Sequence, residues 1–125
     1  MALIREQKVR SQSPLVSISC IAFNQKSYIA QCIDGFLNQD VSFDVEILIH
    51  DDASTDGTTE IIGDYQKKFP NIINAVFQTE NQFSKGARGI HAQFNFNRSR
   101  GKYIATCEGD DYWLNPKKLT RQVQI

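Results

Sequence analysis

The sequence predicts an α/β fold in which a mostly parallel sheet carries helices on both faces. Four short runs of β-branched and apolar residues are spaced along the chain, and such runs are typical of buried strands. Between them lie segments whose apolar residues recur every three or four positions, as on one face of a helix. Strands that alternate with helices in this way form βαβ units with right-handed crossovers. At 125 residues, the chain is long enough for one domain.

The first half of the chain contains two strand–helix units. We expect strands at 15–23, directly after Pro14, and at 45–50. Ser27 is the expected N-cap of the first helix and Thr58 that of the second, because hydroxyl side chains accept hydrogen bonds from the first turn of a helix. The apolar stripes that define these two helices are Ile29, Cys32, Ile33, Phe36 and Leu37 in the first and Ile61, Ile62, Tyr65 and Phe69 in the second.

The second half continues the same alternation. Strands are expected at 72–77 and 103–107, with a glycine-containing loop at 81–89 and a weaker helix at 90–99 between them. Asn115 and Pro116 resemble an N-cap followed by proline in the first turn, so another helix should start there. Ligands of parallel sheets bind beyond the carboxyl ends of the strands, and we therefore look for function in the polar segments that follow them.

Composition excludes several classes of protein. The 14 basic and 14 acidic residues balance, so no basic face for a nucleic acid is expected. No apolar run is long enough to span a membrane. Residues 1–13 lack the apolar core of a signal peptide and are interpreted as a polar lead-in, which favours a cytoplasmic protein. The three cysteines are far apart and form no zinc pattern, so we expect them to be reduced and buried.

Pairs of aspartates follow two of the predicted strands. Asp51 and Asp52 come after the second strand, and Asp110 and Asp111 come after the fourth. Carboxylates that converge need a cation or hydrogen-bond donors to offset their repulsion. The chain has neither of the common glycine-rich phosphate loops, so a divalent ion such as Mg²⁺ or Mn²⁺ would hold the phosphates. A carboxylate that binds no metal can accept hydrogen bonds from a ribose or a uracil. The alternative is that aspartates only cap turns, which we favour for Asp56.

Three motifs in order resemble those of inverting family 2 glycosyltransferases with the GT-A (Rossmann-like) fold. The first strand leads into Phe23 and Asn24, in place of the family's Tyr-Asn. Residues 49–58 are similar to its Val-Asp-Asp-Gly-Ser-Thr-Asp-Gly-Thr segment, and residues 102–113 to its DXD-type segment. The resemblance covers 14–125, which corresponds to part of the family's catalytic domain, truncated after the DXD-type motif. Ala22 and Ala53 depart from the family's usual Thr or Ser and Gly.

The resemblance implies a role for particular residues. Asp52 would bind the base, Asp110 the ribose, and Asp111 the metal ion that bridges the diphosphate. Glu108 stands where many relatives have the first Asp of the motif, a position that could contact the metal or the sugar. The other expected nucleotide-binding residues are Ile21, Ala22 and Phe23 at the end of the first strand, and Lys85 and Arg88 in the 81–89 loop.

The implied activity is metal-assisted transfer of a sugar, with inversion, from a nucleotide sugar to a hydroxyl group of a glycan, lipid or other acceptor. UDP is the expected nucleotide, Mn²⁺ or Mg²⁺ the cofactor, and cell-wall or polysaccharide synthesis the setting, in the cytoplasm or at the inner face of the membrane. The catalytic base is expected beyond Ile125, and no residue of this chain is assigned to it.

Two other interpretations stay open. The chain could be a non-catalytic module that only binds a nucleotide sugar. A signalling receiver domain has a similar length and also gathers acids at strand ends. It would need an acid pair after the first strand, where this chain has Asn24, and an aspartate after the third, where it has Gln78, Thr79 and Glu80. Of the two histidines, His50 is expected to be a satisfied core residue and His91 to face solvent.

Overall fold

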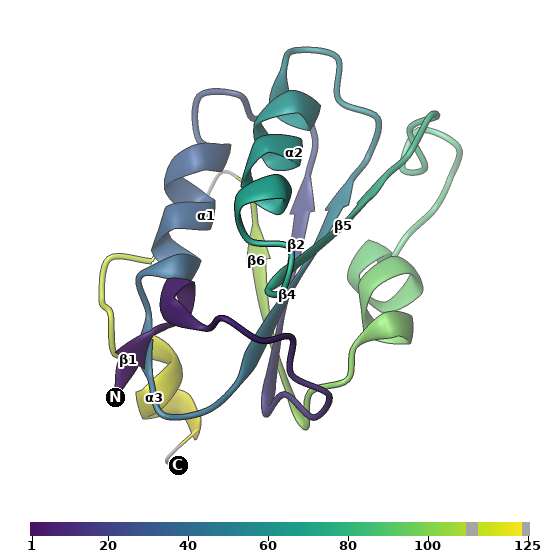
Figure 1. Ribbon diagram of the computed structural model, residues 1–125. Coiled ribbons are helices and arrows are strands. Elements are labelled where there is room, and N and C mark those ends of the chain that lie inside the picture. The colour runs from purple at the N-terminus through teal and green to yellow at the C-terminus, as the bar shows by residue number, and fades with distance from the viewer. Residues whose placement is uncertain (110–112, 124–125) are drawn as a thin grey trace.

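A four-stranded parallel sheet forms the centre of the molecule. The computed structural model describes residues 1–109 and 113–123. The strands of the sheet are β2 (Val16–Ala22), β4 (Val45–Asp51), β5 (Ile73–Phe77) and β6 (Tyr103–Glu108), in the order β5-β4-β2-β6. Every neighbouring pair is parallel, so all four carboxyl ends lie at one edge. The predicted parallel α/β fold is confirmed (Figure 1).

The strand order reverses beside β2. The chain passes from β2 to β4 and on to β5, and then crosses back to place β6 on the other side of β2. In register, Ala22 lies opposite Asp51, and Ile21 lies opposite both His50 and Glu108. A reversal of this kind separates the loops that leave neighbouring strands and so opens a crevice at their carboxyl ends.

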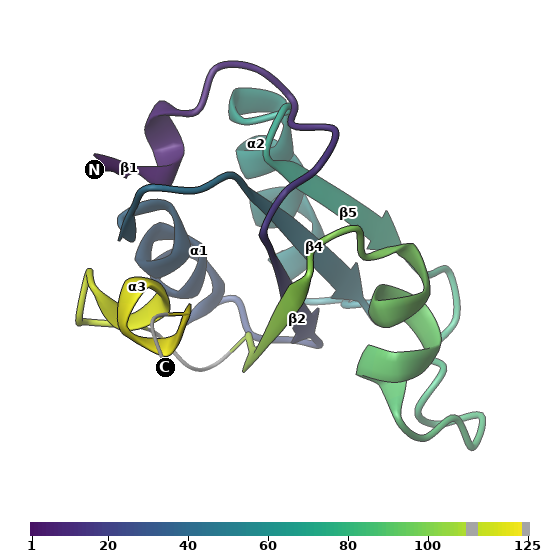
Figure 2. The same ribbon diagram turned by 90° about the horizontal axis from the view of Figure 1, so that it is seen from below.

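Two helices cover one face of the sheet and enclose the apolar core. These are α1 (Ile29–Leu37) and α2 (Thr58–Lys68), which lie on the same side in Figures 1 and 2. The predicted apolar stripe of α1 is fully buried. It packs on alternate residues of the central strands, because side chains of a strand point to opposite faces in turn. The buried strand residues on this face include Val16, Ile18, Cys20, Ala22, Val45, Ile47 and Ile49.

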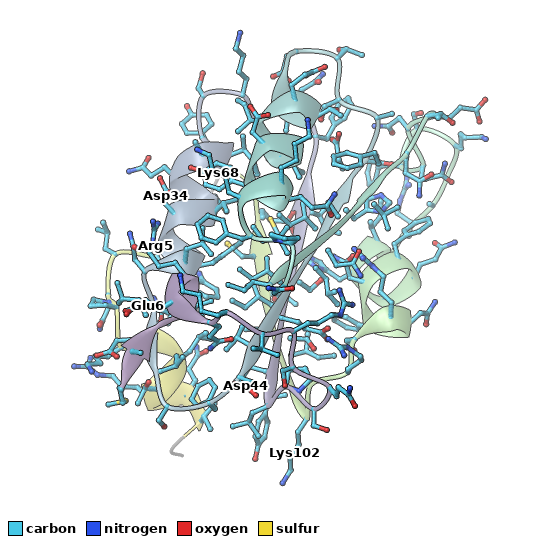
Figure 3. All side chains as sticks on the ribbon, in the orientation of Figure 1. Arg5, Glu6, Asp34, Asp44, Lys68 and Lys102 are labelled. Atoms are coloured by element: carbon cyan, nitrogen blue, oxygen red, sulfur yellow. The ribbon has the colours of Figure 1, made fainter. Side chains whose placement is uncertain are left out.

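The N-terminal segment is packed against this helical layer. Strand β1 (Ala2–Leu3) pairs with β3 (Asp40–Val41), and the short 3₁₀ helix η1 (Ile4–Glu6) buries Ile4 completely. Arg5 lies beside Asp34 of α1, with 3.7 Å between Nη2 and Oδ1 (Figure 3). The lead-in at 1–13 therefore contributes a core residue as well as polar ones. Helix α3 (Lys118–Val123) follows Pro116 as expected and buries Leu119.

The opposite face is covered by a short irregular helix and is largely polar. A π-helical turn, η2 (His91–Asn95), continues into a 3₁₀ turn, η3 (Phe96–Arg98). Figure 2 shows this segment across the sheet from α1 and α2. The strand residues beneath it include Ser17, Ser19, Glu46 and His50, all of them buried. Helical cover on both faces is thus confirmed, although the predicted 90–99 helix is not a regular α-helix.

The predicted helix caps are wrong in detail. Tyr28 occupies the N-cap position of α1 and makes no capping hydrogen bond with its side chain. Gly57, with φ of 105°, occupies that position before α2. The Thr58 hydroxyl instead makes two hydrogen bonds at the turn: its Oγ1 accepts from the Gln25 backbone N–H at 2.9 Å and donates to Asp56 at 2.6 Å. The hydroxyl therefore joins the two turns that follow β2 and β4.

Candidate active site at the carboxyl ends of the strands

A cavity of about 660 Å³ lies at the carboxyl ends of β2, β4 and β6. Its walls bring together Ile21 and Phe23 from the end of β2, Asp52 from the end of β4, and Glu108 from β6. The remaining lining residues come from the segment between β5 and η2: Asn81, Phe83, Ser84, Arg88, Gly89, Ile90 and His91. The cavity therefore lies where the strand order reverses, as the parallel topology requires.

Of the seven expected nucleotide-binding residues, four line this cavity and two, Ala22 and Lys85, do not. Ile21, Phe23, Asp52 and Arg88 line it. Ala22 is fully buried on the other face of β2, because successive strand residues alternate in direction. Its backbone carbonyl accepts a hydrogen bond from the Asp52 N–H at 2.9 Å, so Ala22 supports the site through its main chain. Asp110 and Asp111 lie outside the described residues.

Asp52 is almost fully buried, with 2% of its surface exposed, and is held by hydrogen-bond donors. Its Oδ1 accepts from the Gln82 backbone N–H at 2.8 Å, and its Oδ2 accepts from the Phe83 N–H at 3.2 Å. His50 lies 3.4 Å from Oδ1 through Nε2. A carboxylate has about four acceptor positions, so Asp52 can hold this loop and still accept from a ligand.

The paired aspartate, Asp51, points to the opposite face of β4. Its carboxylate accepts from the Ser54 hydroxyl at 2.5 Å and from the hydroxyl of Thr59 in α2. Asp56 accepts from the Thr58 backbone N–H at 3.0 Å, and the hydrogen bonds from Thr58 lower the pKa of its carboxyl group. The turn-capping role expected for Asp56 is confirmed. Ala53, where the family pattern has Gly, adopts a positive φ of 65°, a conformation that costs an alanine about 1–2 kcal/mol.

The 81–89 loop forms an aromatic and cationic wall of the cavity. The Arg88 guanidinium lies 4.2 Å from the centre of the Phe83 ring, and its Nη1 donates to the Phe83 and Ala87 carbonyls. Phe83 is 56% exposed and Phe23 is 44% exposed, so both rings present apolar surface to a ligand. Lys85 is not among the lining residues and pairs instead with Glu80. That ion pair lowers the pKa of the Glu80 carboxyl group.

His91 links the cavity to the polar face of the sheet. It was expected to face solvent, but its Nδ1 lies 2.7 Å from the Ser19 hydroxyl and its Nε2 lies 3.2 Å from Glu108 Oε1. The sequence contained an indication of this: Ser17 and Ser19 alternate with apolar residues in the first strand. Such alternation predicts one polar face, which polar side chains of the covering helix would have to satisfy.

The second histidine is buried but only partly satisfied. His50 stacks on Phe94 with ring centres 4.5 Å apart, and its Nδ1 has no hydrogen-bond partner among the described residues. Burial lowers the pKa of its imidazole, against the opposing effect of the hydrogen bond to Asp52. Cys20, Cys32 and Cys107 are buried, as expected, and Cys32 Sγ lies 3.9 Å from Cys107 Sγ.

Metal ligation is not evident in the part of the chain that the structure describes. Within residues 1–109 and 113–123, no group of three or more His, Cys, Asp or Glu side chains could hold a metal ion. The carboxylates that line the cavity, Asp52 and Glu108, are oxygen donors of the type that Mg²⁺ and Mn²⁺ prefer. Over the same residues, no helix combines the length and the apolar character needed to traverse a bilayer.

The parallel sheet, with a cavity at its point of strand reversal, places the chain in the class of open α/β domains, whose ligands generally bind beyond the carboxyl ends of the strands. The sequence assigns the chain within that class. The model of glycosyl transferase family 2 matches residues 17–125, and the chain belongs to this family.

Several relatives share this region. An uncharacterized protein of Mycobacterium tuberculosis is 43% identical over 111 residues, which cover 87% of this chain and 30% of the relative. The putative teichuronic acid biosynthesis glycosyltransferase TuaG of Bacillus subtilis is 33% identical, over 90% of this chain and 42% of its own length. The chain therefore spans less than half the length of these relatives.

Solved structures confirm the GT-A fold. The mannosyltransferase PcManGT from Pyrobaculum calidifontis, in complex with GDP-Man and Mn²⁺, superimposes with a TM-score of 0.73 at 23% identity, covering 94% of this chain and 34% of that protein. Residues 1–349 of TarS from S. aureus, in complex with UDP, superimpose with a TM-score of 0.72 at 22% identity, covering 87% of this chain and 31% of theirs. At these identities, the similarity shows the fold.

Proposed function

We propose that this chain forms the donor-binding half of an inverting glycosyltransferase that uses a nucleotide sugar, with UDP as the nucleotide. The observation that carries the proposal is the cavity itself, where Asp52 and Glu108 arrive from two different strands beside the aromatic residues Phe23 and Phe83. Apolar rings can stack on a base, and carboxylates accept hydrogen bonds from base N–H groups and sugar hydroxyls.

Four of the expected residues line the cavity and could contact a donor there. Asp52 accepts a hydrogen bond from the base, and Ile21 and Phe23 form the wall beside it. Arg88 faces the diphosphate, for which a guanidinium is a suitable partner. The assignments of Lys85 to the nucleotide, Asp110 to the ribose and Asp111 to the metal ion rest on family resemblance alone.

The chemistry of transfer explains why such a site is needed. When the bond between the anomeric carbon and the diphosphate breaks, negative charge develops on the leaving oxygen. A divalent ion, Mn²⁺ or Mg²⁺, would stabilise that charge as a Lewis acid. Attack by the acceptor hydroxyl on the opposite side of the anomeric carbon inverts its configuration and requires a base to take the hydroxyl proton. No residue of this chain is assigned that role, so the proposal for this chain concerns donor binding.

The named relatives support the donor class. The PcManGT structure is a complex with GDP-Man and Mn²⁺, and the TarS structures include complexes with UDP and with UDP-GlcNAc. A further relative, 34% identical over 89% of this chain, is the Escherichia coli UDP-Glc:alpha-D-GlcNAc-diphosphoundecaprenol beta-1,3-glucosyltransferase WfaP. By analogy, the acceptor would be a hydroxyl group of a glycan or a lipid-linked sugar, as in cell-wall polysaccharide synthesis.

Calorimetric titration of the chain with UDP tests the proposal. We expect binding in the presence of Mn²⁺ and a Kd at least about tenfold higher after excess chelator is added, a loss of about 1.4 kcal/mol. A parallel titration with GDP tests whether the site prefers uracil to guanine. Absence of UDP binding with Mn²⁺ present would refute the donor-binding proposal. Binding that is unchanged by the chelator would refute the metal's role.

A further inference from the structure

A chain of hydrogen bonds runs from the buried polar face of the sheet into the cavity. It joins five side chains, in the order Arg98, Asn95, Ser19, His91 and Glu108. The successive distances are 2.9 Å from Arg98 Nη2 to Asn95 Oδ1, 2.9 Å from Asn95 Nδ2 to Ser19 Oγ, 2.7 Å from Ser19 Oγ to His91 Nδ1, and 3.2 Å from His91 Nε2 to Glu108 Oε1. Asn95 and Ser19 are buried, whereas the Glu108 side chain is 59% exposed.

The orientation of the Asn95 amide follows from its partners. A guanidinium only donates hydrogen bonds, so the atom that faces Arg98 must be the amide oxygen. The amide nitrogen then faces Ser19 Oγ and the carbonyls of Cys20 and Leu48, at 3.2 and 3.3 Å, which only accept. Both sides of the amide thus give the same assignment.

The tautomer of His91 follows from its partners at both ring nitrogens. Ser19 Oγ accepts a hydrogen bond from Asn95 and has one hydrogen of its own, which His91 Nδ1 is placed to accept. In a neutral imidazole that accepts at Nδ1, the proton is on Nε2. The Nε2–H group therefore donates to the Glu108 carboxylate. Arg98, which cannot accept, determines the direction of the Asn95 bonds, and the Glu108 carboxylate, which only accepts, determines that of the His91 bonds.

We propose that His91 is a positioning residue whose Nε2–H holds the Glu108 carboxylate in place at the cavity. A glutamate at the surface would otherwise sample many rotamers and would have to be ordered each time a ligand binds. With one oxygen engaged by His91, the carboxylate stands ready to accept from a ligand in the cavity. The part of this inference that concerns a ligand rests on the proposed function.

The competing interpretation is that His91 only anchors the 91–98 segment to the sheet. Its ring also lies 6.2 Å from that of Phe96, and loss of such contacts would weaken the fold without involving Glu108. If His91 acts through Glu108, a change of His91 should alter ligand affinity only while Glu108 is present. If His91 only anchors the segment, its effect on affinity should not depend on Glu108.

The first test measures the tautomer directly. Long-range ¹H–¹⁵N spectra at about pH 8, where an ordinary histidine is neutral, should show His91 as the Nε2–H form. The chain has two histidines, so the variant His91→Gln assigns the signals. We expect Ser19→Ala to convert His91 to a mixture of tautomers. Ser99→Ala is the matched control, because the one hydrogen-bond partner of Ser99 Oγ among the described residues is the local Phe96 carbonyl, at 2.8 Å. An Nδ1–H form or an averaged mixture in the wild type would overturn the proposal.

The second test uses UDP with Mn²⁺ as the probe. An asparagine at position 91 can accept from Ser19 but is too short to reach Glu108, whereas a glutamine can place its amide N–H near the position of Nε2. We expect the Kd to rise about tenfold in His91→Asn and to stay within about twofold of wild type in His91→Gln. Both variants are compared with wild type by thermal unfolding, so that a loss of fold is separated from a loss of affinity.

A double-mutant cycle completes the design. If His91 acts through Glu108, then His91→Asn should have little further effect on Kd in a Glu108→Gln background. An equal loss of affinity in both backgrounds would overturn the proposal. A wild-type chain that does not bind UDP would refute the proposed function, and the tautomer measurement would still decide whether His91 holds Glu108.

Discussion

The Asp52 carboxylate accepts a hydrogen bond of 3.2 Å from the backbone N–H of Phe83, which joins the end of β4 to the loop that forms the opposite wall of the cavity. Gln82 donates to the same carboxylate, and the Asn81 side chain donates to the Asp52 carbonyl at 2.9 Å. The loop that carries Phe83 and Arg88 is therefore built on Asp52. The residue expected to bind the base also determines the shape of the site.

Replacing Asp52 by Asn should weaken both the loop and ligand binding. The variant keeps one oxygen but places an NH₂ group opposite a backbone N–H, and a lost hydrogen bond to a charged group costs about 1.5–3 kcal/mol. We expect the Kd for UDP to rise by about tenfold or more. We also expect faster tryptic cleavage after Lys85 and Arg88.

Asp64→Asn serves as the matched control for that variant, because Asp64 is exposed on α2, away from the cavity residues. It should leave both the affinity and the cleavage rate unchanged. If Asp52→Asn behaves like this control, Asp52 neither holds the loop nor binds the nucleotide.

Gly101 lies in close contact with the backbone of β2. A Cβ atom at this position would lie 2.5 Å from the Ser17 nitrogen and 2.8 Å from the Val16 carbonyl carbon, which are main-chain atoms of a central strand and cannot move aside. Gly101→Ala should therefore destabilise the fold by about 1–3 kcal/mol or more. Urea unfolding followed by the fluorescence of the single tryptophan, Trp113, measures this change.

Gly63→Ala is the companion experiment and should stabilise the fold, the opposite of the effect of Gly101→Ala. Gly63 lies within α2, and no heavy atom of the described residues lies within 4 Å of the place that an alanine Cβ would take, apart from its chain neighbours and the backbone of its own helix. Alanine in a helix interior is favoured over glycine by about 0.5–1 kcal/mol. A stability of Gly101→Ala equal to that of wild type would show that the β2–β6 packing is not as close as described.

The four strands of the parallel sheet and helices α1 and α2 were predictable because their apolar side chains repeat with a clear period. Strand β2 begins and ends within one residue of the predicted 15–23, and the α1 stripe is the buried one. The segment at 90–99 was harder to predict because the side chains it directs at the sheet, such as Asn95 and Arg98, are polar. Hydrophobic periodicity carries little information about a helix that packs through hydrogen bonds.

The location of the candidate site could be predicted from the sequence, but not every residue that lines it. Topology places strand ends together, which located Asp52 at the cavity, and the family resemblance added Ile21 and Phe23. Side-chain direction decides the rest: Ala22 faces the core because it alternates with Ile21. The contact between His91 and Glu108 joins residues 17 positions apart on different elements, and it depends on how the irregular helix lies across the sheet.

The buried imidazole of His50 should make the fold less stable at mildly acidic pH. Burial lowers its pKa from the ordinary value of 6.5 and Arg98 adds to this, while Asp52 and Asp51 oppose it. The unfolded chain therefore binds a proton at a pH where the folded chain does not. The free energy of unfolding should fall as the pH drops below about 6.5, by at most about 1.4 kcal/mol per pH unit for this one group.

Urea unfolding at several pH values between about 8 and 5.5 measures that slope. The variant His50→Phe keeps an aromatic ring against Phe94, which lies 4.5 Å away, and removes the titrating group. Its slope over this range should be smaller than that of wild type, whatever its absolute stability. An identical slope in the two proteins would show that His50 is not the origin of the pH dependence.

Arg98 ties the irregular helix to the sheet, and lysine should not replace it. Its guanidinium donates to the carbonyls of Ile49 in β4 and Asn74 in β5, at 3.0 and 3.1 Å, and to Phe94 and Asn95 of its own segment. A lysine ammonium concentrates its donors at one point and cannot reach acceptors on two strands and a helix together. Because a buried acceptor without a partner costs about 1–3 kcal/mol, Arg98→Lys should lose about 2 kcal/mol or more of stability.

Arg121→Lys, at an exposed position of α3, should change stability by less than about 0.5 kcal/mol. Hydrogen exchange should also be faster at the amides of 91–98 in Arg98→Lys alone, since that segment would lose its attachment to β4 and β5. Equal stability and equal exchange in the two variants would show that the segment is held to the sheet by other contacts.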